Sequence, residues 1–288
     1  MTDSSALPTD AAAPSSPLIV VGVRPDGHHS HPALAWAAER ARATGADLKL
    51  VSVVDPKAHA PESRDAHAIA PLESLAQPLR DEGLTVTVEV ADGAHVDRAL
   101  PDAATDAALL VIGTDHVPGG DRERGHLSRH LVAHAHCSVA VVPDLAPEGR
   151  SGVVVGVDGS DVSHRALAFA ADEATRLGEP LTIVSTWMPV PTSMDVTMAY
   201  DPMPYDLQAP TEAFAQTMAE EARTRYPNLE VRLHVIEGDA ATEITDASTS
   251  ARLTVVGTHG RSGLARLFLG STSAVVLENV TAVTVAVR

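Results

Sequence analysis

The chain has 288 residues and a formal net charge of −17, from 38 acidic and 21 basic side chains. A negative charge of this size opposes broad contact with nucleic acid or with an anionic membrane, so any phosphate binding must be local. The single cysteine cannot form an internal disulfide, and no apolar run reaches the length of a membrane span, so we expect a cytoplasmic protein. Aromatic residues make up only 3% of the chain, which predicts a core of Val, Leu, Ile and Ala.

The first 17 residues are rich in Ser, Pro, Ala and Asp, and they lack the basic start and apolar stretch of a signal peptide. Such a polar segment contributes little to a core. We therefore expect a disordered tail over residues 1–17.

An internal duplication organises the rest of the chain. The run LIVVGV at residues 18–23 recurs as GVVVGV at 152–157, and twenty residues from Ala33 match those from Ala166 without a gap. Further along, ALLVIGTD from Ala108 matches RLTVVGTH from Arg252, and SVAVV from Ser138 matches AVTVA from Ala282. The order of elements is the same in both copies.

The duplication sets the expected domain boundaries. Between the copies lies PDLAPEGRSG, whose Pro, Gly and charged residues suit a short linker. We expect a first domain over residues 18–143, a linker over 144–151 and a second domain over 152–288.

In each copy, short β-branched runs alternate with longer stretches of helical period, which is typical of βαβ units. The expected fold class is α/β, with two tandem five-stranded parallel open sheets flanked by helices in a Rossmann-like arrangement. In the second copy the predicted strands cover residues 153–157, 181–185, 230–235, 253–256 and 283–287.

The first helix of the second copy is marked at both ends. Ser160, Asp161 and Ser163 are competent N-caps, and Gly178 suits the C-terminal cap. Its predicted buried face consists of apolar residues at helical spacing, namely Leu167, Ala170, Ala171, Ala174 and Leu177.

A second helix is expected over residues 211–226, where Phe214, Met218 and Ala222 recur at every fourth position. The Pro- and Met-rich stretch before it, residues 186–210, is too irregular for a helix or strand. We interpret it as a long mobile loop and a candidate lid over the sheet.

The most informative segment leaves a strand through Gly257 and enters a helix at Gly270, with Gly260 between them. A glycine just after a strand lets backbone N–H groups approach a ligand with no Cβ in the way. Ser271 and Thr272 would open the next helix, where free N–H groups and the helix dipole favour phosphate oxygens. Local positive charge would come from nearby side chains, namely His259 and Arg261.

Two alternatives stay open for these loops. The glycines alone could simply make turns, although their place beyond the carboxyl ends of a doubly wound sheet favours a ligand. In the loop after the first strand, Gly156 to Ser160, Asp158 could accept from ribose hydroxyls or hold a metal, or it could only cap the following helix.

Outside the tail, the whole chain resembles a tandem universal stress protein. The residues that carry the resemblance are VVGVDGS at the start of the second copy, the Gly257, Gly260, Gly270, Ser271 spacing near its end, and GHLSRHLVAHAHCSVAVVP closing the first copy. The resemblance implies five-stranded sheets of order 3-2-1-4-5, ATP as the ligand, with Mg²⁺ as a candidate companion ion, and pairing of modules through their last strands. It also implies a regulator of stress survival or dormancy rather than a catalyst.

The resemblance places adenine against the ends of the first two strands, near backbone groups of Val184. The residues assigned to nucleotide binding are Gly156, Asp158, Val184, Gly257, Thr258, His259, Gly260, Arg261, Gly263, Gly270, Ser271 and Thr272.

The first copy departs from this pattern. His116 stands where the second glycine belongs, His126 replaces the hydroxyl residue, and Arg24 and Pro25 occupy the place of Asp158. A side chain at position 116 should crowd the phosphates, and one hydroxyl donor is lost. We therefore predict one strong nucleotide site, in the second domain.

Other signals are weaker. His126, His130 and His134 fall on one helical face at a spacing that zinc or nickel sites use, but no Cys or carboxylate joins them in the sequence, so we assign no metal site. Cys137 begins a predicted buried strand and suits a small apolar role. Walker, dinucleotide-fingerprint and hydrolase-elbow motifs are absent from the sequence, so we expect at most slow ATP hydrolysis.

Three functions follow from these observations. The first is an ATP-binding regulator that an as yet unknown protein partner reads. The second is a nucleotide-independent scaffold, in which both copies serve only in assembly, as a homodimer or by pairing within the chain. The third is an ATP-using enzyme. The sequence favours the first because the second glycine loop is intact.

Overall fold

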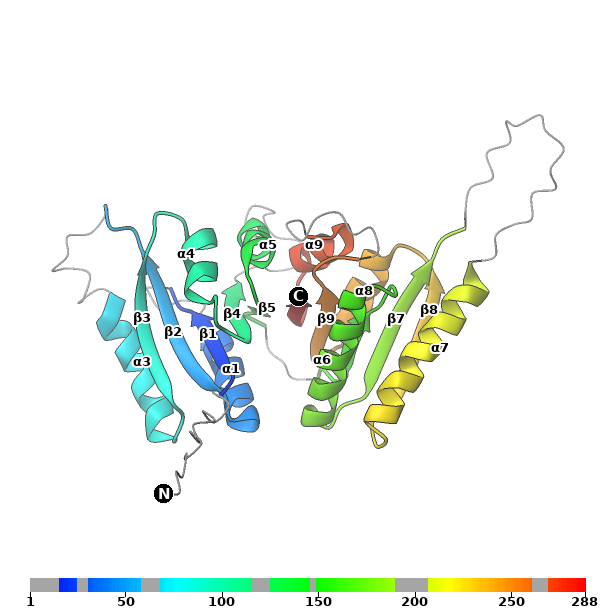
Figure 1. Cartoon of the computed structure of the whole chain (residues 1–288), viewed down its shortest axis with the longest axis horizontal. Helices are drawn as coiled ribbons and strands as arrows, with labels where there is room; N and C mark the ends of the chain where they lie inside the picture. Colours follow the sequence, from blue (N-terminus) through cyan, green and yellow to red (C-terminus); the bar gives the residue numbers. More distant parts are fainter. Residues whose placement is uncertain are drawn as a thin grey trace, which may run out of the picture.

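The computed structural model describes residues 16–24, 31–57, 68–114, 125–145, 149–189, 207–260 and 269–288. The expected tail lies almost wholly outside these ranges, as do residues 190–206 of the candidate lid and residues 261–268 of the glycine loop. Within the described parts, strands and helices alternate along the chain in two successive sets (Figure 1). The fold class predicted from the sequence is confirmed: a mostly parallel α/β sheet flanked by helices.

We call residues 18–143 module 1 and residues 152–288 module 2. The elements of module 1 are β1 (Leu18–Gly22), α1 (His31–Thr44), β2 (Asp47–Val54), α3 (Ala70–Asp81), β3 (Val86–Asp92), α4 (Val96–Ala103), β4 (Leu109–Thr114), α5 (Gly125–His134) and β5 (Ser138–Pro143). Those of module 2 are β6 (Val153–Gly156), α6 (Asp161–Leu177), β7 (Leu181–Trp187), α7 (Gln208–Arg225), β8 (Val231–Glu237), α8 (Ala240–Ser248), β9 (Leu253–Gly257), α9 (Ser271–Glu278) and β10 (Val283–Val287).

The strands form one continuous ten-stranded sheet of order β3-β2-β1-β4-β5-β10-β9-β6-β7-β8. Within each module the strands are parallel and follow the expected order 3-2-1-4-5. The pairing of modules through their last strands, which the resemblance implies, is present: β5 and β10 pair antiparallel at the centre and join the two expected five-stranded sheets into one. Each of these strands ends its module, so its outer backbone groups need a partner, and the other module supplies it.

Strand register also corrects the alignment of the two copies. Leu109 of β4 pairs with Ser138, whereas its counterpart Leu253 of β9 pairs with Val283. Ser138 is therefore equivalent to Val283 and not to Ala282, the match that the sequence letters suggest. The connection before β5 is one residue shorter in the first copy, which shifts the alignment by one position.

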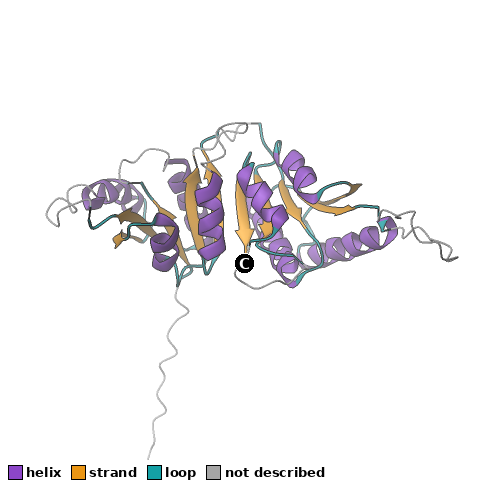
Figure 2. Ribbon diagram, turned by 90° about the horizontal axis from the view of Figure 1, so that it is seen from above, coloured by secondary structure: helices purple, strands orange, loops and turns teal. Residues whose placement is uncertain are grey.

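Helices cover both faces of the sheet (Figure 2). The core between them is built from small and branched aliphatic side chains, as the composition predicts. On the face covered by α6, for example, the helix contributes Ala166, Leu167, Ala170, Ala171 and Ala174, all of which are at most 1% exposed.

The ends of α6 are fixed by local signals that the sequence displays. Ser160 is the N-cap, and its hydroxyl oxygen accepts a hydrogen bond from the Ser163 amide at 3.2 Å. Gly178 closes the helix in the left-handed region, with φ of +66°, and the Glu179 amide donates to the Ala174 carbonyl at 2.9 Å. This geometry favours glycine because other residues are strained at positive φ.

We expect Gly178→Ala to destabilise module 2 by about 1 kcal/mol. A Cβ at residue 178 has no atom within 4 Å, so the cost arises from the positive φ alone. Denaturant unfolding followed by circular dichroism measures it. Gly178→Asn should cost less than half as much, because asparagine tolerates this conformation, and equal stability of wild type and Gly178→Ala would contradict the assignment.

Candidate functional site

A cavity of about 250 Å³ opens at the carboxyl ends of β6, β7 and β9 in module 2. In a doubly wound sheet this is the point where the strand order reverses, since the chain continues from β6 to β7 on one side and β9 lies on the other. Its walls come from three strands and the first turns of α6, α8 and α9. The lining residues are Gly156, Val157, Asp158, Ser163, Val184, Ser185, Thr186, Ala240, Ile244, Val256, Gly257, His259, Gly260, Gly270, Ser271, Thr272 and Ser273.

The first turn of α9 lies at this cavity, which Ser271, Thr272 and Ser273 line. Gly270 is the N-cap of α9 and provides no side-chain hydrogen bond to the amides that follow. By contrast, Ser160 caps α6 and Asp239 caps α8 through their side chains. A helix start without a side-chain cap, placed at a cavity, presents N–H groups and the positive end of the helix dipole to an anion.

The start of α9 is held against β9 by short polar contacts. The Ser273 hydroxyl donates to the Gly257 carbonyl at 2.5 Å, and the Gly270 amide donates to the Thr258 carbonyl at 2.8 Å. Thr258 in turn donates its amide to the Val287 carbonyl at the end of β10, also at 2.8 Å. The two ends of the glycine loop are thus fixed, although residues 261–268 between them lie outside the described part.

Two glycines at the cavity are closely packed. A Cβ on Gly257 would lie 2.8 Å from Val162 Cγ1, and one on Gly260 would overlap the carboxylate oxygen Oδ2 of Asp158. Gly260 therefore brings bare backbone next to the Asp158 carboxylate, in the wall where we expect phosphate or metal.

Asp158 is held in a turn of its own. Its Oδ1 accepts a hydrogen bond from the Ser160 amide at 3.0 Å, while Ser160 itself is the helix cap. Asp158 is therefore not the N-cap of α6, and its second carboxylate oxygen lies on the cavity side near Gly260. This position is compatible with both remaining roles, acceptance from ribose hydroxyls and metal binding.

One wall of the cavity is formed by the apolar side chains of Val184, Ile244 and Val256. The Val184 carbonyl accepts a hydrogen bond from the Val157 amide at 3.0 Å, so one of its two lone pairs is already used. A flat apolar ring system suits this wall better than a charged group does.

Nine of the twelve residues assigned from the sequence line the cavity: Gly156, Asp158, Val184, Gly257, His259, Gly260, Gly270, Ser271 and Thr272. Thr258 is buried beside it, with its hydroxyl 3.0 Å from His259 Nδ1. Arg261 and Gly263 lie outside the described residues. The sequence analysis missed the cavity residues Val157, Ser163, Ser185, Thr186, Ala240, Ile244, Val256 and Ser273.

Most of the corresponding loop of module 1 lies outside the described residues, including Pro25 and His116, and so does the side chain of His126. In the described part, Gly22 approaches Leu100 just as Gly156 approaches Ile244 in module 2. The scaffold around the crevice is therefore repeated, and the prediction of a weakened first site rests on the sequence of the loop.

The histidines of α5 do not form a metal centre within the described part of the chain, where no group of three potential ligands comes together. His134 Nδ1 lies 2.8 Å from the His130 carbonyl, and His130 Nδ1 lies 3.6 Å from Asp97 Oδ2, a carboxylate that sequence order did not place there. Burial raises the pKa of the Cys137 thiol, which keeps it protonated and unreactive.

The fold and the cavity together define a class: a doubly wound α/β protein with a glycine-lined crevice at the carboxyl ends of the strands in its second half. Among the described helices, none has the length and apolarity needed to cross a membrane.

Comparison with known proteins gives the family. The family model for the universal stress protein family matches residues 18–143 and again residues 150–288. A universal stress protein of Mycobacterium tuberculosis is 30% identical over 285 residues, covering 90% of this chain and 92% of its own length, and one of Mycolicibacterium smegmatis is 30% identical, covering 94% and 96%. The chain belongs to the universal stress protein family and carries two such domains in tandem.

Solved structures agree at the level of the fold. A universal stress protein from Archaeoglobus fulgidus superposes with a TM-score of 0.69 at 16% identity, covering 95% of this chain and 97% of its own. A putative universal stress protein from Pseudomonas aeruginosa gives 0.68 at 24% identity, covering 94% and 92%.

We expect Ser273→Ala to lower the free energy of unfolding of module 2 by about 1 kcal/mol, because it removes a buried hydrogen bond between α9 and β9. Urea denaturation measures the change. Ser271→Ala, an exposed hydroxyl two residues earlier, is the matched control and should stay within about 0.5 kcal/mol of wild type. Equal effects of the two substitutions would show that the Ser273 contact does not stabilise the start of the helix.

Proposed function

We propose that this protein is a nucleotide-dependent regulator of stress response or dormancy, which binds ATP in module 2. The observation that carries the proposal is the start of α9, where Gly270 leaves the first amides without a side-chain cap at the wall of a cavity. The uncapped amides suit phosphate oxygens, the two close-packed glycines let the backbone approach the ligand closely, and the apolar wall suits the base of a nucleotide. The regulatory role rests on membership of the family.

The donor set fits a magnesium nucleotide. Amides and hydroxyls of Ser271 and Thr272, left uncapped by Gly270, would hold phosphate oxygens, together with the backbone at Gly257 and Gly260. Asp158 offers a carboxylate oxygen, which suits Mg²⁺ or a ribose hydroxyl. Adenine would lie against Val184 and the neighbouring apolar wall. Bound Mg²⁺ would supply charge neutralisation for the phosphates.

We propose that the protein is not an enzyme beyond slow ATP hydrolysis. Within the described part of the chain, Asp158 and His259 are the titratable side chains that line the cavity. The Asp158 carboxylate is tied to the Ser160 amide, and His259 Nδ1 lies at the Thr258 hydroxyl. With Asp158 Oδ2 assigned to Mg²⁺ or ribose, this set of side chains leaves no carboxylate to activate water, so the nucleotide acts by changing a surface that a protein partner recognises.

We propose a first domain over 18–143, a linker over 144–151 and a second domain over 152–288, with the nucleotide in the second. The cytoplasm is the proposed location, because ATP is present there and a buried lone thiol such as Cys137 stays reduced.

Isothermal titration calorimetry of the full chain with ATP tests the site. Gly260→Glu combined with Gly270→Glu places two carboxylates in the phosphate wall and should weaken binding by about a hundredfold or more. Thr224→Glu, on the exposed side of α7, is the control for added negative charge and should bind like wild type. Unchanged affinity in the double variant, or no binding by wild type, refutes the proposal.

The role of Asp158 can be separated by the same titration with and without Mg²⁺. If Asp158 holds the metal, Asp158→Ala weakens binding about tenfold in Mg²⁺ and has little effect in EDTA. If it accepts from ribose, the loss is similar in both buffers. An unchanged affinity in both would remove Asp158 from the site.

A second candidate function, a scaffold that needs no nucleotide, is favoured by the direct β5–β10 pairing of the two modules. Acid release of adenine nucleotide from purified protein, detected by mass spectrometry, would exclude it for module 2. A chain that neither carries nor binds nucleotide would support the scaffold.

A further inference from the structure

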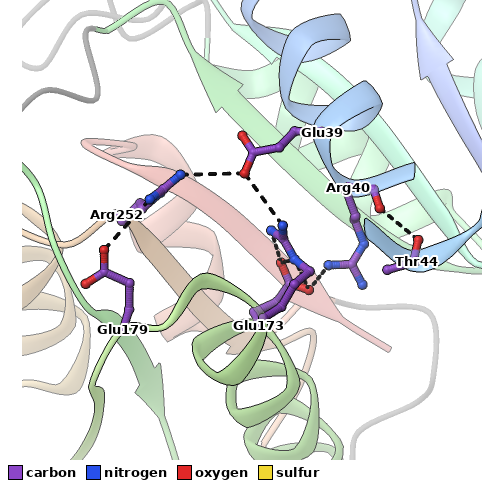
Figure 3. A network of polar contacts seen from close by, with 7 residues as sticks. Glu39, Arg40, Thr44, Glu173, Glu179 and Arg252 are labelled. Atoms are coloured by element: carbon purple, nitrogen blue, oxygen red, sulfur yellow. Dashed lines mark hydrogen bonds and ion pairs between the residues drawn. The ribbon is translucent and has the colours of Figure 1, made fainter. Parts of the chain in front are cut away.

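A network of charged side chains crosses between the modules below the β5–β10 pair (Figure 3). At its centre, Arg40 of α1 donates a hydrogen bond to Glu173 of α6. The Glu173 side chain is only 3% exposed, and that of Arg40 is 15% exposed. This is a buried ion pair between two elements that belong to different modules.

Glu173 also pairs with a second cation, and the guanidinium of Arg40 lies against two aromatic rings. Arg176, one turn further along α6, donates to Glu173 Oε2 at 2.9 Å. The Arg40 guanidinium lies 4.8 Å from the ring centre of Phe169 in module 2 and 5.9 Å from that of Trp36 in module 1. Both charges are therefore compensated, and the contact depends on both modules being present.

The two residues of this pair are equivalent positions of the duplication. The ungapped match of Ala33 with Ala166 continues to Arg40 and Glu173, which are 133 residues apart. They meet because α1 and α6 approach each other across the pseudo-twofold axis at the β5–β10 pair. Two copies of one module, paired in the same way, would instead bring identical charges face to face.

The neighbouring ion pairs of Glu39 also join the two modules and also depend on residues that only one module carries. Glu39 of module 1 lies 3.6 Å from Arg176 and 3.6 Å from Arg252, both in module 2. The module 1 positions equivalent to these arginines are Ala43 and Ala108. A pair of module 1 copies would therefore lose both cations that face Glu39.

The module 2 equivalent of Glu39 is Asp172, whose carboxylate accepts a hydrogen bond from Tyr226 of its own module. In a pair of module 2 copies, each Glu173 would keep its own Arg176 but would face a second buried Glu173 in place of Arg40. Bringing two charged carboxylates together at a buried, desolvated position is strongly unfavourable.

We propose that Arg40 and Glu173 restrict pairing across the last strands to unlike modules, so that the module 1 face fits the module 2 face and rejects a copy of itself. This inference goes beyond nucleotide binding and does not depend on it. It defines a selective interaction surface whose partner is the other half of the same duplicated unit.

Charge reversal in the full chain reproduces the like-charge contacts expected in a pair of identical modules. Arg40→Glu creates the Glu–Glu contact of two module 2 copies, and Glu173→Arg creates the Arg–Arg contact of two module 1 copies. Hydrogen exchange at the strand residues that pair across the junction, 139–141 and 284–286, reports opening of the interface. Each single reversal should accelerate exchange there by about tenfold or more.

The double reversal, Arg40→Glu with Glu173→Arg, restores opposite charges and should bring exchange back to within about threefold of wild type. Arg42→Glu is the matched control, since Arg42 lies on the same helix and pairs with Glu82 inside module 1, and it should leave the junction unchanged. Single reversals that exchange like wild type, or a double reversal no better than the singles, would overturn the proposal.

A comparison of two further variants keeps the test valid if the charge-reversed chains fold poorly. Glu173→Gln keeps the size of the side chain and removes its charge, so adding it to Arg40→Glu should slow exchange at the junction relative to Arg40→Glu alone. Equal or faster exchange in that double variant would contradict charge repulsion as the cause.

Discussion

The antiparallel pairing of β5 with β10 is the interaction on which the arrangement of the whole chain depends. Both are last strands of their modules, and both consist almost entirely of buried apolar residues. Left unpaired, each would expose a row of backbone donors and acceptors beside an apolar edge, a combination prone to aggregation. Joining them removes both edges at once and turns two five-stranded units into one sheet.

The crevice of module 2 is built outward from this junction. The Thr258 amide binds the end of β10, the Gly270 amide binds Thr258, and Ser273 ties α9 to Gly257. The start of α9 is thus linked through two hydrogen bonds to β10, the strand that contacts module 1, and through a third to β9. The glycine loop and the contact between modules therefore share one piece of backbone.

Local signals made much of the fold predictable from the sequence. The duplication and the β-branched runs placed β6, β9 and β10 within one residue of their ends, and Ser160 and Gly178 fixed the limits of α6. These predictions succeed because caps and strand runs are properties of neighbouring residues.

Features that depend on distant contacts were missed or shifted. The strands β7 and β8 run two residues further than expected, α7 begins three residues earlier, and the nine-residue α8 was not predicted. These errors explain the gaps in the site, because Ala240 and Ile244 come from α8 and Thr186 from the extended end of β7. The union of the two sheets was expected only from the family resemblance, because it depends on pairing between residues far apart in sequence, which no local pattern of either strand displays.

The opposite signs of residues 40 and 173 also bear on the history of such a chain. If such a chain arose by fusion of two copies of a self-pairing unit, this position had to carry residues compatible with self-pairing before the fusion and could diverge after it. With arginine in one half and glutamate in the other, neither half would pair with a copy of itself without a compensating change. On the pairing proposed above, that divergence makes the fusion difficult to reverse.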